Sequence, residues 1–150
     1  MTKFTKGTLV LEILSANLTR DLEVFSKMDP LCEFTAVMKN NEVFKQRTEV
    51  ANEMGQNPVW NNNTVTMEID SSPDAAPKTL NFNQTVKFRL WEIDLTKEDA
   101  IGYATVTVAQ LCFNGGTTRD FEIRWDNGSA GTVKVKSKYT DPSFQAEIEK

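Results

Sequence analysis

The stretch Gly7-Thr8-Leu9-Val10-Leu11-Glu12-Ile13-Leu14 carries the pattern that decides the fold. Its side chains at Leu9, Leu11 and Ile13 are apolar and recur at every second residue. A period of two predicts a β-strand with one face on a core and the other in solvent. The same alternation returns in residues 31–38, 64–69, 86–91, 105–108, 121–125 and 132–136, and more weakly in 42–50.

Turn signals separate these runs. Asn-Gly at 114–115 and at 127–128 is among the strongest dipeptides for a tight turn. About eight short strands with turns between them are typical of an all-β protein. The pattern therefore predicts an antiparallel β-sandwich.

The length of the chain suits one domain. With 150 residues, we expect a single domain over 1–150 whose core runs from about 7 to 139. In the tail 140–150, Asp141 and Pro142 suit the first positions of a short helix. A frayed terminus is the alternative, and it is the preferred interpretation for so short a segment.

Composition excludes several classes of protein. The net charge of −4 gives no general attraction to nucleic acid or anionic lipid. The chain has no histidine, which excludes Ser-His-Asp and Cys-His catalysis and histidine metal sites. Cys32 and Cys112 lie in apolar runs and are expected to be buried free thiols. Met1–Lys6 is too polar for a signal peptide and no run is long enough to span a bilayer, so we expect a cytoplasmic protein without a transmembrane segment.

Two distant segments each concentrate carboxylates in a loop beside a predicted strand. They are Asp21–Pro30 and Trp91–Asp99. If the fold brings them together, their acidic side chains share one small volume and repel one another. A hard cation would relieve that repulsion, and calcium takes six to eight oxygen ligands, mainly carboxylates and carbonyls.

Six short motifs occur in the order and spacing of a known β-sandwich family. They are Gly7–Ile13 with Ala16-Asn17-Leu18, Lys27-Met28-Asp29-Pro30, Asn57-Pro58-Val59-Trp60-Asn61, Leu90-Trp91-Glu92-Ile93-Asp94, Asp99-Ala100-Ile101-Gly102 and Gly131-Thr132-Val133-Lys134-Val135. Together they resemble the C2 domain, a module that binds calcium and phospholipid, over about 7–139. The resemblance implies an eight-stranded antiparallel Greek-key β-sandwich in the family's second topology.

The resemblance also implies a calcium site. Carried over by position, its ligands would be Glu23 and Asp29 from the first loop, and Glu92, Asp94 and Asp99 from the third loop. Glu23 and Glu92 stand where the family usually has aspartate, and the loop lengths also differ slightly from the family's. Weak calcium binding, binding of fewer ions and no binding therefore all remain open.

Two further surfaces follow from the same resemblance. Val24, Phe25 and Leu95 would be apolar loop tips that insert into a membrane, although Val24 and Phe25 could equally fold back onto the sandwich. Lys39, Lys45 and Arg47 would form a basic patch, which is thin because acidic residues lie near it. Nucleic acid is not an expected partner.

Three functions can be weighed from the sequence. The first is a calcium-responsive module that docks peripherally on anionic phospholipid membranes by electrostatic switching. The alternative is a calcium-independent protein-interaction or scaffold subunit of a cytoskeletal or trafficking assembly. The third is an enzyme that uses paired carboxylates as in glycoside hydrolysis, but no activated nucleophile or cleft supports it, so we expect no catalytic activity.

Overall fold

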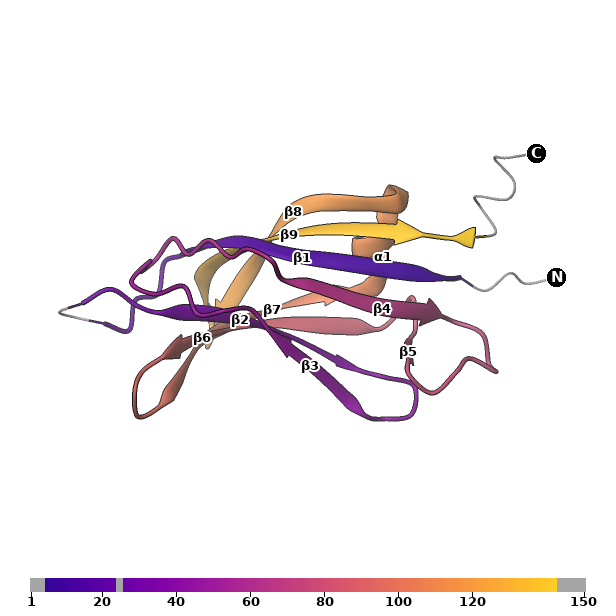
Figure 1. Ribbon diagram of the computed structural model, residues 1–150, viewed down its shortest axis with the longest axis horizontal. Coiled ribbons are helices and arrows are strands. Elements are labelled where there is room, and N and C mark those ends of the chain that lie inside the picture. Colours follow the sequence, from indigo (N-terminus) through magenta and orange to yellow (C-terminus); the bar gives the residue numbers. More distant parts are fainter. Residues whose placement is uncertain (1–4, 24–25, 143–150) are drawn as a thin grey trace.

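The computed structural model describes residues 5–23 and 26–142 (Figure 1). Nine strands and two short helical segments follow one another in this part of the chain. Their bounds are β1 Lys6–Leu18, β2 Pro30–Val37, β3 Val43–Arg47, β4 Thr64–Asp70, β5 Thr79–Leu80, β6 Thr85–Ile93, β7 Glu98–Thr107, α1 Val108–Cys112, η1 Phe113–Gly115, β8 Gly116–Trp125 and β9 Gly128–Thr140.

The strands form one continuous ladder that folds over into two layers. Their order is β3-β2-β6-β7-β8-β9-β1-β4-β5. β7 and β8 are joined by a single residue pair, Tyr103 with Arg124, so the sheet turns over at this point. Figure 1 shows β8, β9 and β1 above β2, β6, β7 and β3. Between the layers the rings of Phe88 and Phe121 stack with their centroids 6.4 Å apart. The predicted β-sandwich is confirmed.

Alternation of buried and exposed side chains continues along β1 but changes phase within it. Leu9, Leu11 and Ile13 are buried, and so are Ala16 and Leu18 farther along the strand. The buried positions change from odd to even residue numbers at the point where the pairing of β1 with β9 shifts, between Ile13 and Ser15. Such a shift is typical of a β-bulge, which adds a residue to one strand. It explains why the sequence pattern breaks after residue 14 although the strand continues.

Two elements differ from the expected set. β5 is a two-residue strand that pairs in parallel with β4, so nine strands replace the expected eight. Two residues show no period, and no sequence pattern could have indicated them. Residues 108–112 form the short helix α1, and a capping box of Thr107 and Gln110 stabilises its start. The sequence pattern predicted a strand through residue 108 instead. The helix considered for the C-terminal tail falls at 142–148, where all but Pro142 lies outside the described residues.

The core contains the residues that hold the loop end of the sandwich. Cys32 and Cys112 are buried free thiols, as expected. Trp60 is buried, and its indole Nε1 donates to the carbonyl of Pro30 at 3.3 Å. Pro30 begins β2, directly after the first acidic segment. Trp60 therefore fixes the point where that segment enters the sheet.

Candidate functional site

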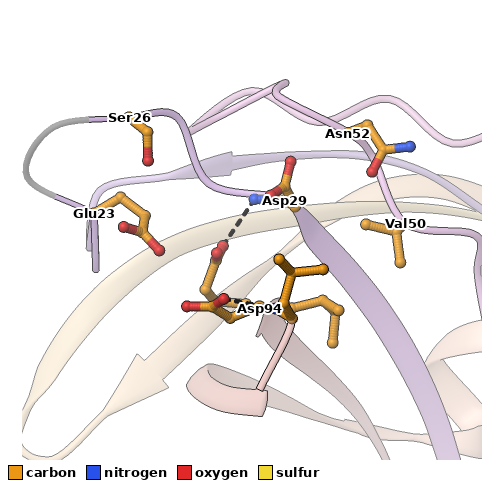
Figure 2. Close-up of a pocket in the computed structure, with 9 residues that line it drawn as sticks. Glu23, Ser26, Asp29, Val50, Asn52 and Asp94 are labelled. Carbon is orange, nitrogen blue, oxygen red and sulfur yellow. Dashed lines mark hydrogen bonds between the residues drawn. The ribbon is translucent and has the colours of Figure 1, made fainter. Parts of the chain in front are cut away.

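The two acidic segments meet at one end of the sandwich, where they form a hollow of about 450 Å³. Figure 2 shows Glu23, Asp29 and Asp94 around this hollow. Four of the five predicted ligand residues line it, from both loops. The complete lining is Glu23, Ser26, Asp29, Val50, Asn52, Glu92, Ile93, Asp94 and Leu95.

Pairing of β2 with β6 brings the segments together. The ladder places Pro30 opposite Glu92, so the residue before β2 lies beside the end of β6. The Asp29 backbone N–H donates to Glu92 Oε2 at 2.8 Å, and the Ile93 N–H donates to the Asp29 carbonyl at 3.1 Å. Figure 2 draws the first of these bonds as a dashed line from Asp29. The close approach of the two loops thus follows from strand register.

Glu92 is the buried member of the hollow, with 2 % of its surface exposed. Burial raises its pKa to about 7; the hydrogen bond from Asp29 opposes the rise, while the carboxylates of Glu23 and Asp29 add to it. Near neutral pH the Glu92 carboxyl is therefore protonated in some molecules and ionised in the others. A positive charge in the hollow would favour the ionised form.

Two of the other carboxylates already accept from backbone N–H groups, Asp29 from a different loop and Asp94 from its own loop. Asp29 Oδ1 accepts from the Glu53 N–H at 2.6 Å, and Asp94 Oδ1 accepts from the Leu95 N–H at 2.6 Å. Within residues 5–23 and 26–142, no three acidic, histidine or cysteine side chains are placed to hold a metal ion. The oxygen-only donor set fits calcium chemically. However, its members would have to turn toward one another to ligate an ion.

Asp99 and its neighbour Glu98 do not line the hollow. Asp99 Oδ2 lies 3.5 Å from Lys97 Nζ on the β6–β7 hairpin. Arg47 holds Glu98 with two hydrogen bonds of 2.7 and 2.9 Å. These bonds hold the pKa of Glu98 below its usual range. The structure therefore lines the hollow with Glu23, Asp29, Glu92 and Asp94, whereas Asp99 lies opposite Glu92 in the β6–β7 ladder without lining it.

Of the three predicted membrane-inserting residues, the structure describes one. Leu95 lines the hollow and is fully exposed, with a relative accessibility of 103 %. The N–H of its neighbour Asp94 donates to the Lys97 carbonyl at 2.9 Å, which closes the hairpin turn. Val24 and Phe25 lie outside the described residues.

Two residues of the predicted basic patch already bind other groups of the protein. Lys39 Nζ donates to the carbonyls of Pro73 and Ala75 at 2.7 and 2.9 Å. Arg47 Nε binds the buried carboxylate of Glu33 at 2.8 Å in addition to its bonds with Glu98. Lys45 is exposed on β3. The patch therefore offers fewer free cations than its sequence implies.

Sequence reasoning missed two cations on the same outer sheet face. Lys87 and Arg89 lie on β6 opposite Thr35 and Glu33 of β2. Both alternate with the buried Phe88, so the period of two already places them on the solvent side of their strand. The sequence did not show the order of the strands. In the structure β6 lies beside β2, so Lys87 and Arg89 lie on the same outer face as Lys45 of β3.

Comparisons with known proteins agree with this architecture. The family model described as C2 domain matches residues 7–124. A comparison with curated protein sequences gives no match. No helix in the described part of the chain is long and apolar enough to cross a membrane.

Solved structures resemble the fold at low sequence identity. A C2 domain-containing protein from a putative elicitor-responsive gene is 22% identical over 95% of both chains, with a TM-score of 0.66. A C2 domain of plant Extended Synaptotagmin 1 is 13% identical over 91% of this chain and 96% of that one, with a TM-score of 0.71. A calcium-bound pair of C2 domains from Extended Synaptotagmin 2 is 17% identical over 91% of this chain and 46% of that one, with a TM-score of 0.67. At these identities the likeness establishes the fold alone.

Proposed function

Because the chain belongs to the C2 domain family, we propose that it is a calcium-responsive module that docks peripherally on anionic phospholipid membranes. One observation carries the proposal: the carboxylates of Glu23, Asp29, Glu92 and Asp94 line one hollow whose rim bears the fully exposed Leu95. In this proposal the protein is cytoplasmic, associates with a membrane surface and catalyses no reaction.

The charge of the hollow supplies the switch. With a net charge of −4, the chain is repelled by an anionic bilayer, and the four carboxylates concentrate that repulsion at the loop end. Calcium, when bound, supplies positive charge that the carboxylates share with lipid phosphate groups. Asp29 and Asp94 would turn their free oxygens inward, and Glu92 would lose its proton as its pKa falls.

Leu95 contributes the apolar part of docking. Its side chain is exposed in water, so its transfer to a lipid interface would contribute up to roughly 2 kcal/mol. A single leucine gives weak and reversible attachment, since stable anchoring takes more than one signal. We therefore expect binding that depends on calcium and on the fraction of anionic lipid together.

A second candidate function has its own support. Asp29 already accepts a backbone hydrogen bond from Glu53 in the β3–β4 connection, Asp94 accepts one from Leu95 in its own loop, and Asp99 lies 3.5 Å from Lys97. Loops stabilised in this way can present a surface without a metal. The alternative is therefore a calcium-independent protein-interaction or scaffold subunit of a cytoskeletal or trafficking assembly.

Vesicle sedimentation separates the two candidates. The protein is mixed with vesicles of phosphatidylcholine and phosphatidylserine in roughly a 3:1 ratio, with millimolar calcium or with chelator. We expect sedimentation only with calcium, its loss in Asp94→Asn, and no change in the matched control Asp120→Asn on the exposed side of β8. Equal sedimentation of wild type and Asp94→Asn would contradict the proposal. Binding of a stoichiometric protein partner in chelator, without vesicle binding, would favour the alternative.

A further inference from the structure

Arg20 directly precedes the first acidic segment, and its side chain reaches across to β7 and β8. Its Nη1 donates to the carbonyls of Ala100 and Ile101 at 2.8 and 3.1 Å. Its guanidinium carbon also lies 4.2 Å from the centre of the Trp125 ring. Ala100 comes directly after Asp99, the last residue of the second acidic segment. One side chain thus joins the start of the first acidic segment to the end of the second.

The two carbonyls lie where β7 is irregular. Its pairing with β6 passes from Gly102 directly to Ala100, so Ile101 is the extra residue of a bulge. On the other side, β7 pairs with β8 only through Tyr103 and Arg124. Buried or half-buried carbonyls beside such a break in the ladder need a donor from elsewhere, and Arg20 supplies it.

The backbone of the first acidic segment is fixed at the same point. The N–H groups of Thr19 and Arg20 donate to the Ala130 carbonyl at 2.8 and 3.4 Å. Farther along, Asp21 Oδ1 accepts from the Glu23 N–H at 3.0 Å. Glu23 is the first carboxylate of the hollow along the chain. It therefore follows a fixed point closely, and this short link limits how far it can move.

The two acidic segments are thus tied to each other at two places. The hydrogen bond from the Asp29 N–H to Glu92 joins the end of the first segment to β6. The bonds of Arg20 join its start to β7. In chain order, Glu23 and Asp94 each lie between the two ties, and both line the hollow. The distance between these two carboxylates therefore depends on both ties.

We propose that Arg20 is a positioning residue for calcium, which holds the first acidic segment against β7 so that Glu23 and Asp94 stay within reach of one ion. The proposal rests on the proposed calcium function and adds a residue that acts on the hollow without lining it. A segment that is already ordered loses less entropy when it binds an ion. Groups that orient metal ligands in this way change metal affinity by about ten- to a hundredfold. Arginine suits the task because its planar guanidinium can stack on Trp125 and donate at the same time.

NMR in chelator tests the positioning itself, without calcium. In Arg20→Met an apolar side chain remains, but the two donated hydrogen bonds and the charge are lost. We expect the Thr19 amide to exchange its hydrogen about tenfold faster than in wild type, and the order parameter of the Glu23 N–H to fall. Arg119→Met is the matched control and should change neither value. Arg119 is exposed on β8, where its guanidinium carbon lies 5.4 Å from the centre of the Phe121 ring.

Isothermal titration with calcium tests the consequence. Arg20→Met is expected to bind calcium about tenfold more weakly than wild type. Arg20→Lys keeps the charge and can still donate, so it should recover part of the loss. Arg119→Met changes the net charge by the same amount and should bind like wild type. Thr107→Ala removes the N-cap of α1 and should also bind like wild type, which separates positioning from a general loss of stability. Melting curves verify that each variant is folded at the temperature of the titration.

Three outcomes would overturn the proposal. One is that Arg20→Met leaves the Thr19 exchange and the Glu23 order parameter unchanged. Another is that Arg20→Met binds calcium as tightly as wild type or more tightly, which would mean that the Arg20 charge repels the ion more than its bonds order the segment. The third is that Thr107→Ala weakens calcium as much as Arg20→Met does.

Failure of the proposed function would look different. In that case wild type itself would give no heat with calcium, and the calcium step of this proposal would fall with it. The exchange and order measurements in chelator would still decide whether Arg20 holds the first acidic segment in place.

Discussion

Replacing Glu92 by glutamine measures how much the charge of the Glu92 carboxylate lowers the stability of the folded protein. The carboxyl is 2% exposed and its pKa is raised from 4.5 to about 7, chiefly by burial. Glutamine keeps an oxygen that can accept the Asp29 N–H, and its amide can donate to the Glu23 carboxylate, which lies within hydrogen-bonding reach of residue 92. The substitution therefore removes the charge and preserves the shape.

The sign follows from the two pKa values. Below pH 4.5 the carboxyl is protonated in both the folded and unfolded states, so the charge has no effect on stability. Between pH 4.5 and about 7 the unfolded chain ionises first, and the native state loses stability as pH rises. Each pKa unit corresponds to about 1.4 kcal/mol, so the loss above pH 7 is about 3 kcal/mol.

Thermal melting in chelator tests this reasoning. For a chain of this size, about 3 kcal/mol corresponds to a Tm change of roughly 9 °C. Glu92→Gln should therefore melt roughly 9 °C above wild type at pH 8 and close to wild type at pH 4.5. Glu12→Gln, at an exposed position of β1, is the matched control and should change Tm little at either pH. A Tm difference between Glu92→Gln and wild type that stays constant from pH 4.5 to pH 8 would refute the reasoning.

Three further substitutions test the supports of the fold by urea unfolding. Arg47→Met leaves the buried Glu33 carboxylate unpaired and, because Arg47 is partly exposed, should lower the free energy of unfolding by about 2 kcal/mol. Thr107→Ala removes the N-cap of α1 and should lower it by about 1 kcal/mol. Gly131→Ala places a side chain at a φ of +126° and drives its Cβ against the Asn17 carbonyl, so a loss of roughly 3 kcal/mol or more is expected.

Each of these expectations has a definite contrary result. Wild-type stability of Arg47→Met would mean that the Glu33 carboxylate does not need Arg47 as its partner. Unchanged unfolding of Thr107→Ala would show that α1 is held by packing rather than by its cap. A fully stable Gly131→Ala would show that the end of the β1–β9 ladder accommodates a side chain at this positive φ.

The β-sandwich could be predicted because its signal is local. Burial on one face of a strand forces a period of two, and runs such as 7–14 and 86–91 display it directly. β5 could not be predicted, since two residues carry no period. The continuation of β1 past Leu14 was hidden because the bulge between Ile13 and Ser15 reverses which residues face the core.

The site was predictable in part for a similar reason. The acidic segments were visible as composition, and the family resemblance implied that they meet at one end of the sandwich. The structure adds that the pairing of Pro30 with Glu92 brings them together. What the sequence could not show is which carboxylates are already engaged. The pairing of Asp99 with Lys97, and of Glu98 with Arg47, depends on side-chain directions within the folded hairpin.

The cations on the outer face of the sheet could not be assessed from the sequence either. Lys87 and Arg89 are ordinary alternating residues of one strand, and their meaning depends on which strands lie beside them. Arg47 looked like a free cation, but the fold places it between Glu33 and Glu98. Local charge counts therefore misjudged both the number and the position of the available cations.

Isothermal titration with calcium at pH 7, in two buffers of different ionisation enthalpy, tests the central claim most directly. The account predicts saturable heat that differs between the buffers, because Glu92 releases part of a proton as calcium binds, and it predicts loss of that heat in Asp94→Asn. The absence of heat at millimolar calcium, together with an unchanged Tm, would contradict it, since a ligand of the native state must stabilise that state.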